Sequence, residues 1–420
     1  MPDAGFKMDL QKEIGSLDCF RQDFPALSRE YNGRSLVYLD GPGGSQVPQA
    51  VIHAVSKYYQ NSNSNSHGTF ITTRETDEVI EYARKSMAAL LGATGPETIS
   101  FGQNMTTLNF SLSKALARFL KLGSKILITQ LDHEANRGPW LTLKEYGFNV
   151  EEITLKTDGT LDYDDFQKKL TDRTSLVAVG YASNALGTVN DLKNIREWTR
   201  EKGSLLLVDA VHHVPHFSVD VTSLDCDFLL CSAYKFYGPH VGILYSRPGL
   251  LDLLPTDRLV TQQKSAPCKI ETGTLNHAAL AGVGAAVDYL ASLGTGVSLR
   301  DKLTGAMSRI SDHEFILYER LYYKLSELQG LTIIGPAPDP DWHTPTISFT
   351  LDGYIPVEVC KFLASNGICA WDGHFYAQRS IDVLGLLAKG GVTRFGINLY
   401  TSQEEVDYTV DCMYQLVNSK

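Results

Sequence analysis

The chain has 420 residues, of which 43% are hydrophobic and 20% charged, and its formal net charge is -10. This is the composition of a globular protein, and the length is enough for two unequal domains. The acidic balance excludes an electrostatic reason to bind nucleic acid or an anionic membrane surface, and no apolar run approaches the roughly 18 residues of a membrane span.

Helical and strand-like segments alternate from about residue 45 to 250. The clearest helical pattern is RETDEVIEYARKSMAALLGA, whose apolar residues recur at a period of about 3.6. Thr72 with Glu75 predicts a capping box at its start, and Gly92 predicts its end. Further helices are expected at residues 49–60, 105–120, 136–146, 162–170 and 192–202.

Seven short runs of β-branched or aliphatic residues separate these helices: TISFG, KILITQL, VEEITL, SLVAVGYAS, LLLVDAV, FLLCSA and VGILY. Their near-continuous apolarity is typical of strands that are buried on both faces. Alternation of strand and helix predicts a mostly parallel sheet covered on both sides. Ligands of such a sheet gather outside the carboxyl ends of the strands.

The order of elements changes after helices expected near 275–292 and 301–329. Strands LTIIG and TPTISFTLDG, helix PVEVCKFLASNG, strands ICAW and VTRFGINLY and a helix from Gln403 predict a smaller α+β domain. Loops are expected at 338–345 and 376–390. We divide the chain into an N-terminal segment 1–30 that packs on the small domain, a large domain 31–290 and a small domain 291–420.

The seven cysteines are scattered and never form a CxxC pair. This pattern predicts neither a disulfide framework nor a thiolate zinc site, so no metal is expected, and most cysteines are interpreted as small core residues. The first residues lack the basic and apolar parts of a signal peptide, which makes the cytoplasm the expected location.

Polar residues cluster where five of the predicted strands end. Asn104, His133, Asn184, Asp209 and Ser232 each follow an apolar run. Each residue taken alone is typical of a turn or a cap. Because the carboxyl ends of parallel strands meet at one edge of a sheet, their common placement favours a shared site.

Asp209 and Lys235 give this site a specific chemistry. Asp209 ends the strand LLLVD, where a buried carboxylate needs a cationic or hydrogen-bonding partner. Lys235 follows FLLCSAY on a neighbouring strand. An acid and a lysine so placed suit pyridoxal phosphate, whose ring nitrogen requires a carboxylate and whose aldehyde requires an amine. The alternative is a structural ion pair between Asp209 and Lys235.

Several motifs agree in order and spacing with one family, from VYLDGPGGSQVPQAV to the final helix, and the most specific are VDAVHHVPH and SAYKFYGPHVGILY. The chain resembles the class V aminotransferase and cysteine desulfurase family of fold-type I pyridoxal phosphate enzymes, in its desulfurase-like branch. The resemblance implies a large domain with a mostly parallel seven-stranded sheet and a smaller α+β domain. It also implies an amino acid substrate and a homodimer.

The resemblance assigns roles to the strand-end residues. Lys235 would hold the cofactor aldehyde as a Schiff base and later move the substrate Cα proton. Asp209 would hold the pyridine nitrogen, and His133 in LDHEAN would stack on the cofactor ring. Asn184 in ASNALGT and His212, at the family's usual glutamine position, would lie near the phenolic oxygen.

The phosphate site implied by the resemblance combines residues from three segments. Asn104 and Met105 would present a helix N-terminus, which favours anions. Ser232 would join them, together with Thr274 in IETGTLN from a second subunit. The family's S-x-H-K motif contains Tyr234 in place of its histidine, and Tyr234 can offer only a neutral hydroxyl.

Two further residues match positions that face the substrate. Arg394 in VTRFGINLY matches the arginine that grips the substrate α-carboxylate as a bidentate pair. The alternative is a surface strand arginine. His67 in SNSHGTF matches a segment that lines the entrance, although a histidine in a polar loop is commonly only solvated.

The chain departs from the family in WDGHFYAQRS. Desulfurases carry Gly-His-His-Cys here, and the final thiol attacks the substrate sulfur, whereas this chain has His374 and Tyr376 in a Gly-His-Phe-Tyr segment. A phenol is a poor nucleophile for sulfur at neutral pH. Cys369 and Cys268 are the alternative thiols, and buried cysteines are usually inert.

Loss of the thiol favours a β-eliminating carbon-sulfur lyase that acts on cysteine, cystine or an S-substituted cysteine, with Tyr376 or His374 as the acid that assists the leaving group. The alternatives are an aminotransferase, an epimerase and a desulfurase that uses another cysteine. A cofactor-binding regulator would need a DNA-binding domain for which the short N-terminus leaves no room. A catalytically idle scaffold would be indifferent to loss of Lys235.

Overall fold

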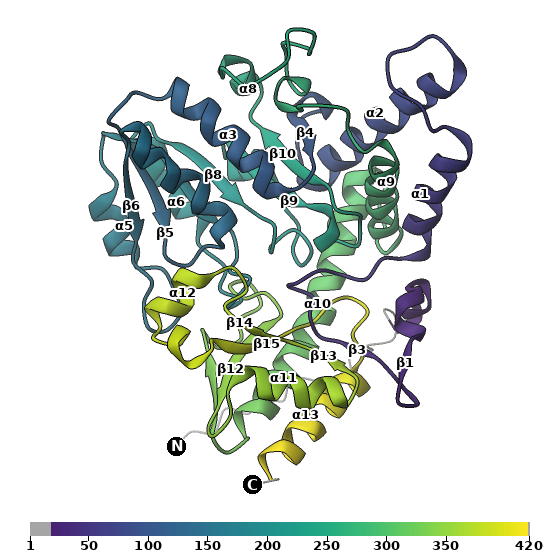
Figure 1. Ribbon diagram of the computed structural model, residues 1–420, viewed down its shortest axis with the longest axis vertical. Helices are drawn as coiled ribbons and strands as arrows, with labels where there is room; N and C mark the ends of the chain where they lie inside the picture. Colours follow the sequence, from purple (N-terminus) through teal and green to yellow (C-terminus); the bar gives the residue numbers. More distant parts are fainter. Residues whose placement is uncertain (1–17, 419–420) are drawn as a thin grey trace.

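The computed structural model describes residues 18–418 as a large body at the top of Figure 1 and a smaller one below it. Helix α10 (Leu299–Ser326) runs from the first into the second. Arg21, in the first described turn, bonds both carboxylate oxygens of Glu405 in the small body at 2.8 Å. Residues 1–17 of the expected N-terminal segment lie outside the described residues, and the proposed division into domains stays a prediction.

Seven strands form the sheet of the large body in the order β4-β10-β9-β8-β7-β5-β6. Only β10 runs antiparallel to its neighbours, which confirms the expected mostly parallel sheet. The strands are β4 (Ile99–Gly102), β5 (Lys125–Thr129), β6 (Asn149–Ile153), β7 (Thr174–Gly180), β8 (Leu205–Asp209), β9 (Phe228–Ser232) and β10 (Gly242–Ser246).

Both faces of this sheet are buried. Leu127 and Val177 pack in one core with helices α2 (Ile71–Leu91) and α9 (His277–Ser292), while Ile126 and Ala178 pack in another with α3 (Met105–Phe119). Successive side chains of a strand point to opposite faces, so apolar residues are needed at every position. The other helices are α1 (Gln49–Asn61), α4 (Gly138–Leu141), α5 (Tyr163–Lys169), α6 (Leu192–Glu201), α7 (Val221–Leu224) and α8 (Leu250–Leu253).

The small body contains a four-stranded antiparallel sheet in the order β11-β12-β15-β14. Its strands are β11 (Leu331–Ile334), β12 (Thr346–Leu351), β14 (Trp371–Gly373) and β15 (Val392–Gly396), and its helices include α11 (Pro356–Ser365), α12 (Gln378–Val383) and α13 (Gln403–Val417). A short parallel pair joins β3 (Val37–Tyr38) to β13 (Ile368–Cys369), while β1 (Glu30–Tyr31) pairs with β2 (Arg34–Ser35).

Two helix predictions in the large body were wrong in detail. Phe70 precedes α2 and gives no side-chain cap, because the helix already begins at Ile71 and places Thr72 inside its first turn. Gly92 does end the helix in the left-handed conformation, with φ of 66°. The segment 136–146 is not one helix, since it divides into 3-10 turns on either side of α4, which contains Pro139 at its start.

Two predictions in the small body were also wrong. The expected loop 376–390 contains α12, whose buried Ser380 hydroxyl lies 2.9 Å from the carbonyl oxygens of Gln130 and Leu131. The expected strand ICAW divides at Ala370, because its two halves pair with different partners. Both deviations bring the small body into contact with other parts of the chain.

Candidate active site

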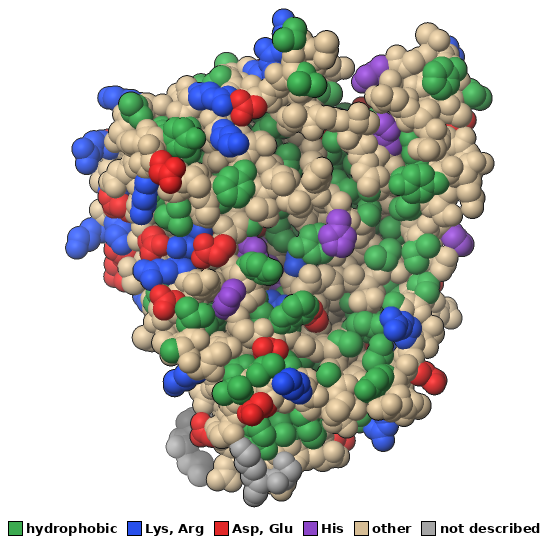
Figure 2. Space-filling model, in the orientation of Figure 1, with side chains coloured by type: hydrophobic (Ala, Val, Ile, Leu, Met, Phe, Trp, Pro, Cys, Tyr) green, Lys and Arg blue, Asp and Glu red, His purple; other side chains and the backbone are tan. Residues whose placement is uncertain are grey.

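A cavity of about 80 Å³ opens at the carboxyl ends of β5, β7, β8 and β9. Figure 2 shows lysine, arginine and histidine atoms deep between the two bodies on this side of the molecule. Nine of the residues singled out from the sequence line the cavity: Asn104, Met105, His133, Asn184, Asp209, His212, Ser232, Tyr234 and Lys235. The strand-end pattern therefore does bring these residues to one place.

Lys235 ends a short 3-10 turn that directly follows β9. Its side chain is buried, and its ammonium donates a hydrogen bond to the Pro42 carbonyl. Burial lowers the pKa of Lys235 to about 7, and the charge of Arg394 adds to this effect, while Asp40 and Asp209 oppose it. A large share of the amine is thus neutral near pH 7, which is the form that attacks a carbonyl or takes a proton.

Asp209 is the last residue of β8, and its Oδ1 accepts the Val211 N-H at 3.0 Å. Burial raises its pKa to about 7, with a smaller contribution from the charge of Asp132. Asp132 also lines the cavity, and sequence reasoning missed it although it directly precedes His133. The Gly180 N-H and the Asn136 amide both bond Asp132 at 2.9 Å, and burial raises its pKa to about 6.

Two neutral histidines border the cavity. His133 caps a 3-10 turn through Nδ1, which accepts the Ala135 N-H at 2.9 Å. Burial, together with the charges of Lys235 and Arg394, lowers its pKa to about 4. Burial also holds the pKa of His212 well below its usual value, and its Nε2 lies 2.9 Å from the Thr346 hydroxyl of β12. His212 thus links the cavity to the small body.

The start of α3 forms the end of the cavity best suited to an anion. Asn104 caps the helix by accepting the Thr107 N-H at 2.9 Å, and the Met105 N-H lies 3.4 Å from the Ser232 hydroxyl. A Cβ added at Gly242 would lie 2.2 Å from the Asn104 carbonyl carbon, so only glycine lets β10 approach this helix start. Free N-H groups and the helix dipole favour a phosphate there.

Arg394 lies on β15 next to the cavity and is 2% exposed. Its guanidinium donates to Asp40 at 2.8 Å and to the Asn184 carbonyl at 2.9 Å, and its Cζ lies 4.1 Å from the centre of the Phe375 ring. Among residues 18–418, Nε has no hydrogen-bond partner. A buried arginine with an unused donor is suited to receive a carboxylate.

The segment Gly373–Ala377 reaches from the small body to this site. Phe375 and Tyr376 both have positive φ, at 52° and 58°, which is uncommon for residues other than glycine. The Asn184 amide donates to the Phe375 carbonyl at 2.9 Å, and the Tyr376 ring lies 5.7 Å from the His133 ring. His374 Nδ1 accepts the Tyr376 N-H at 3.2 Å.

His67 and Thr274 line a different cavity of the same chain, together with Cys268. His67 is exposed and lies 3.4 Å from Asp77. Burial and the charge of Glu271 raise the pKa of the Cys268 thiol, and burial likewise raises that of Cys369, whose backbone pairs with Tyr38. Neither cysteine lines the Lys235 cavity.

The residues of the Lys235 cavity fit pyridoxal phosphate. A buried amine, a buried carboxyl and a helix start match the aldehyde, the ring nitrogen and the phosphate of the cofactor. Asn184 Oδ1 is buried without a partner among the described residues, so an acceptor is available for a hydroxyl on the ring. Within residues 18–418, no group of three or more histidine, cysteine or acidic side chains could hold a metal ion, and no helix is long and apolar enough to cross a membrane.

The comparisons with known proteins agree with this geometry. The model of the family "Aminotransferase class-V" matches residues 37–409. A cysteine desulfurase of Salmonella gallinarum is 33% identical over 93% of this chain and 95% of its own length, and a probable cysteine desulfurase of Halalkalibacterium halodurans is 32% identical over 91% and 94%.

Solved structures show the same similarity. The apo structure of a cysteine desulfurase from Thermococcus onnurineus has a TM-score of 0.85 and 27% identity, and covers 96% of this chain and 98% of its own. An Escherichia coli cysteine desulfurase in an S-sulfonic acid form has a TM-score of 0.83 and 26% identity over the same shares.

Proposed function

The chain belongs to the aminotransferase class-V family of pyridoxal phosphate-dependent enzymes, and from this premise we propose that it is a carbon-sulfur lyase. Its substrate would be cysteine, cystine or an S-substituted cysteine, and its reaction β-elimination. Relatives that are named cysteine desulfurases support a sulfur amino acid as substrate.

The observation that carries the proposal is Tyr376. By the resemblance of its segment, it matches the position at which desulfurases have their thiol. Its side chain is 70% exposed and its ring lies 5.7 Å from that of His133. The alternative thiols Cys369 and Cys268 both lie outside the Lys235 cavity, and burial raises the pKa of each. A thiol that stays protonated is a poor nucleophile. Elimination needs no protein thiol, so it suits this chain better than sulfur transfer.

Each residue has a defined task in this reaction. The cofactor, when bound, supplies an electron sink that eases removal of the substrate Cα proton. Arg394 would hold the substrate α-carboxylate, and Lys235 would take the Cα proton at Nζ. The Cβ-S bond then breaks, and the sulfur leaves with the bonding electrons and takes a proton from the Tyr376 hydroxyl or the His374 imidazole. With one water, cysteine thus yields pyruvate, ammonia and hydrogen sulfide.

The cofactor would be held by residues of three kinds. Asp209 would pair with the ring nitrogen, neutral His133 would stack on the ring, and the Asn104–Met105 helix start with Ser232 would bind the phosphate. Tyr234 stacks on His240 at 4.6 Å, with the Lys235 ammonium 4.8 Å from the centre of its ring. Its neutral hydroxyl would replace the imidazole of the family motif.

We also propose a homodimer in which Thr274 completes the phosphate site of the second subunit. Thr274 lines cavities of its own chain that do not include Lys235, which agrees with a role in a neighbouring site. His67 lines one of the same cavities and would border the entrance from there. The cytoplasmic location stays a prediction.

Product analysis tests the proposed function. The purified protein is incubated with cysteine, cystine and S-alkylcysteines, with Lys235→Ala as the matched control. Pyruvate with ammonia in equal amounts, absent from the control, is the expected result. Alanine with released sulfur would mean desulfuration, and Cys369→Ser and Cys268→Ser would then identify the thiol. Keto acid in a single half-reaction would mean transamination, and Cα proton exchange alone would mean epimerisation.

A further inference from the structure

The stretch 376–380, which begins with Tyr376, is held by the large body at both of its ends. At the first end, the Tyr376 carbonyl accepts the Glu134 N-H at 2.7 Å. Glu134 is the first residue of a 3-10 turn, so its N-H has no partner within the turn. At the second end, the Ser380 hydroxyl reaches carbonyls that follow β5. The position of Tyr376 therefore depends on contacts between the two bodies.

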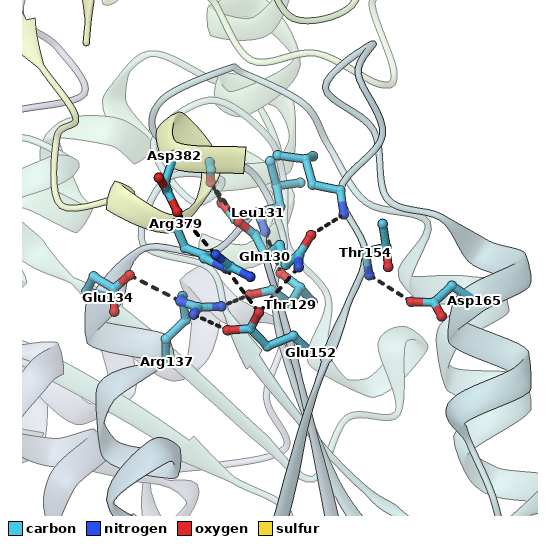
Figure 3. Close-up of polar contacts among 12 residues, drawn as sticks. Thr129, Gln130, Leu131, Glu134, Arg137, Glu152, Thr154, Asp165, Arg379 and Asp382 are labelled. Carbon is cyan, nitrogen blue, oxygen red and sulfur yellow. Dashed lines mark hydrogen bonds and ion pairs between the residues drawn. The ribbon is translucent and has the colours of Figure 1, made fainter. Parts of the chain in front are cut away.

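Glu152 on β6 is the centre of a charged network that adds to these contacts, as Figure 3 shows. One of its oxygens accepts a bond from Arg137, and the other accepts the Arg379 Nε-H at 3.0 Å. Arg137 also donates to the Glu134 carboxylate at 3.2 Å. We name these three side chains, Arg137, Glu152 and Arg379, the clasp.

The clasp connects the turn that His133 caps with the helix that follows Tyr376. Arg379 is the second residue of α12 and lies three residues after Tyr376. Arg137 follows the turn that His133 caps, and it is 3% exposed. A single carboxylate thus ties the turn of His133 to the helix that follows Tyr376. Burial would raise the pKa of Glu152, but the bond from Arg137 and the charges of both arginines hold it below its ordinary value, so this carboxylate stays charged near neutral pH.

We propose that Arg379 and Glu152 are positioning residues, which act through Tyr376 by keeping its ring next to that of His133. The catalytic part of this inference rests on the proposed function, because it is elimination that would use Tyr376 as an acid. The structural part, that the clasp fixes the chain around Tyr376, does not depend on the proposed function. Phe375 and Tyr376 hold a left-handed backbone, which is unfavourable for residues with side chains and persists only where surrounding contacts fix it.

The test compares Arg379→Ala with a matched control, Arg320→Ala. Arg320 has nearly the same exposure as Arg379, 36% against 37%, and also bonds a carboxylate, Asp407, but it lies within the small body. Hydrogen-deuterium exchange of the cofactor-loaded protein is read on peptides that contain Glu134. We expect exchange about threefold faster in Arg379→Ala, since loss of one half-exposed ion pair changes a local equilibrium by roughly two- to fivefold. Arg320→Ala should exchange as the parent does.

Kinetics supply the second readout. In Arg379→Ala we expect kcat on the sulfur substrate to fall about threefold, while KM stays within about 1.5-fold of the parental value, because Asp40 and Asn184 hold Arg394 separately. Arg379→Lys keeps the charge next to Glu152 and should restore most of kcat. A purely structural role would not be rescued in this way.

The outcomes separate the two proposals. Equal exchange at Glu134 in Arg379→Ala and Arg320→Ala would overturn the clasp, whatever the activity. Faster exchange with unchanged kcat would overturn the positioning role. If the parent protein eliminates none of the sulfur substrates, the proposed function fails, and faster exchange in Arg379→Ala alone would still support the clasp as the element that fixes Tyr376.

Discussion

The candidate site has two parts, the Lys235 cavity and the segment 373–377. The cavity is formed by buried strand ends, whereas the segment is held by contacts with the other body. In the cavity, Asp209 ends the largely buried strand β8 and Lys235 closes the turn after β9, and burial is the main cause of their altered pKa values. In the segment, Tyr376 is 70% exposed, and it is held by bonds to the other body. The pKa values of the two proposed reactive groups are thus set by burial in the core, whereas the position of the proposed acid, Tyr376, depends on a contact between the two bodies.

The largest expected effect tests the cavity. Lys235→Ala should lower kcat/KM for elimination by at least about a thousandfold, since it removes both the amine and the base. Lys125→Met is the control, because Lys125 is equally buried, at 8%, and bonds Glu151 at the opposite end of β5. Steady-state pyruvate formation measures both. Unchanged activity in Lys235→Ala would defeat every enzymatic role considered for this chain.

A second prediction concerns Arg394, which both regions contact. Arg394→Lys keeps a charge next to Asp40 but loses the planar pair of donors. We expect KM for the amino acid to rise about a hundredfold, with a smaller change in kcat. Cysteamine, which lacks the carboxylate, should be turned over equally poorly by both proteins. A KM that stays at the parental value would remove Arg394 from carboxylate binding.

Tyr376→Phe tests the segment alone. This variant removes one hydroxyl and keeps the ring next to His133. We expect kcat to fall about tenfold, which is less than the roughly hundredfold or more for complete loss of a general acid, because His374 remains. Tyr146→Phe is the control, since Tyr146 is also exposed, at 61%, and lies on a 3-10 turn of the large body. Equal kcat in the two variants would leave His374 as the acid.

The smallest expected effect concerns stability of the cofactor-free protein. Burial raises the pKa of Asp209 to about 7, whereas an unfolded aspartate titrates near pH 3.9. The folded state therefore binds this proton more tightly, and the contribution of Asp209 to stability is full below about pH 4 and is lost as the pH rises to 7. Asp209→Asn should raise Tm by roughly 2 to 5 °C at pH 8 and change it little at pH 4. An equal shift at both pH values would contradict the buried charge as its cause.

Sequence patterns were enough for the sheet and for most of the cavity, because both follow from local rules. Buried parallel strands need apolar side chains at every position, and polar residues at their ends, such as Asn184 and Asp209, then fall at one edge. Asp132 was missed because the bond that brings it to the end of β7 comes from Gly180, 48 residues away in the chain.

Contacts between distant segments account for the remaining errors. Helix α12 has only six residues, and it is fixed by the Ser380 hydroxyl on carbonyls about 250 residues away in the chain. Arg394 and Asp40 are 354 residues apart, so no local pattern shows that the arginine proposed to bind the substrate carboxylate already bonds an acid of the chain. The clasp is likewise made of residues whose partners only folding identifies.

The parallel pair of β3 and β13 has a consequence for synthesis of the protein on the ribosome. Val37 is translated 331 residues before its partner Ile368. At roughly 5 to 20 residues per second, its strand waits about 17 to 66 s with an open edge. The seven-stranded sheet can form during this interval, but the four-stranded sheet of the small body cannot be completed until nearly the whole chain has emerged. The nascent chain would therefore gain the core of its cofactor cavity first and the Tyr376 segment last.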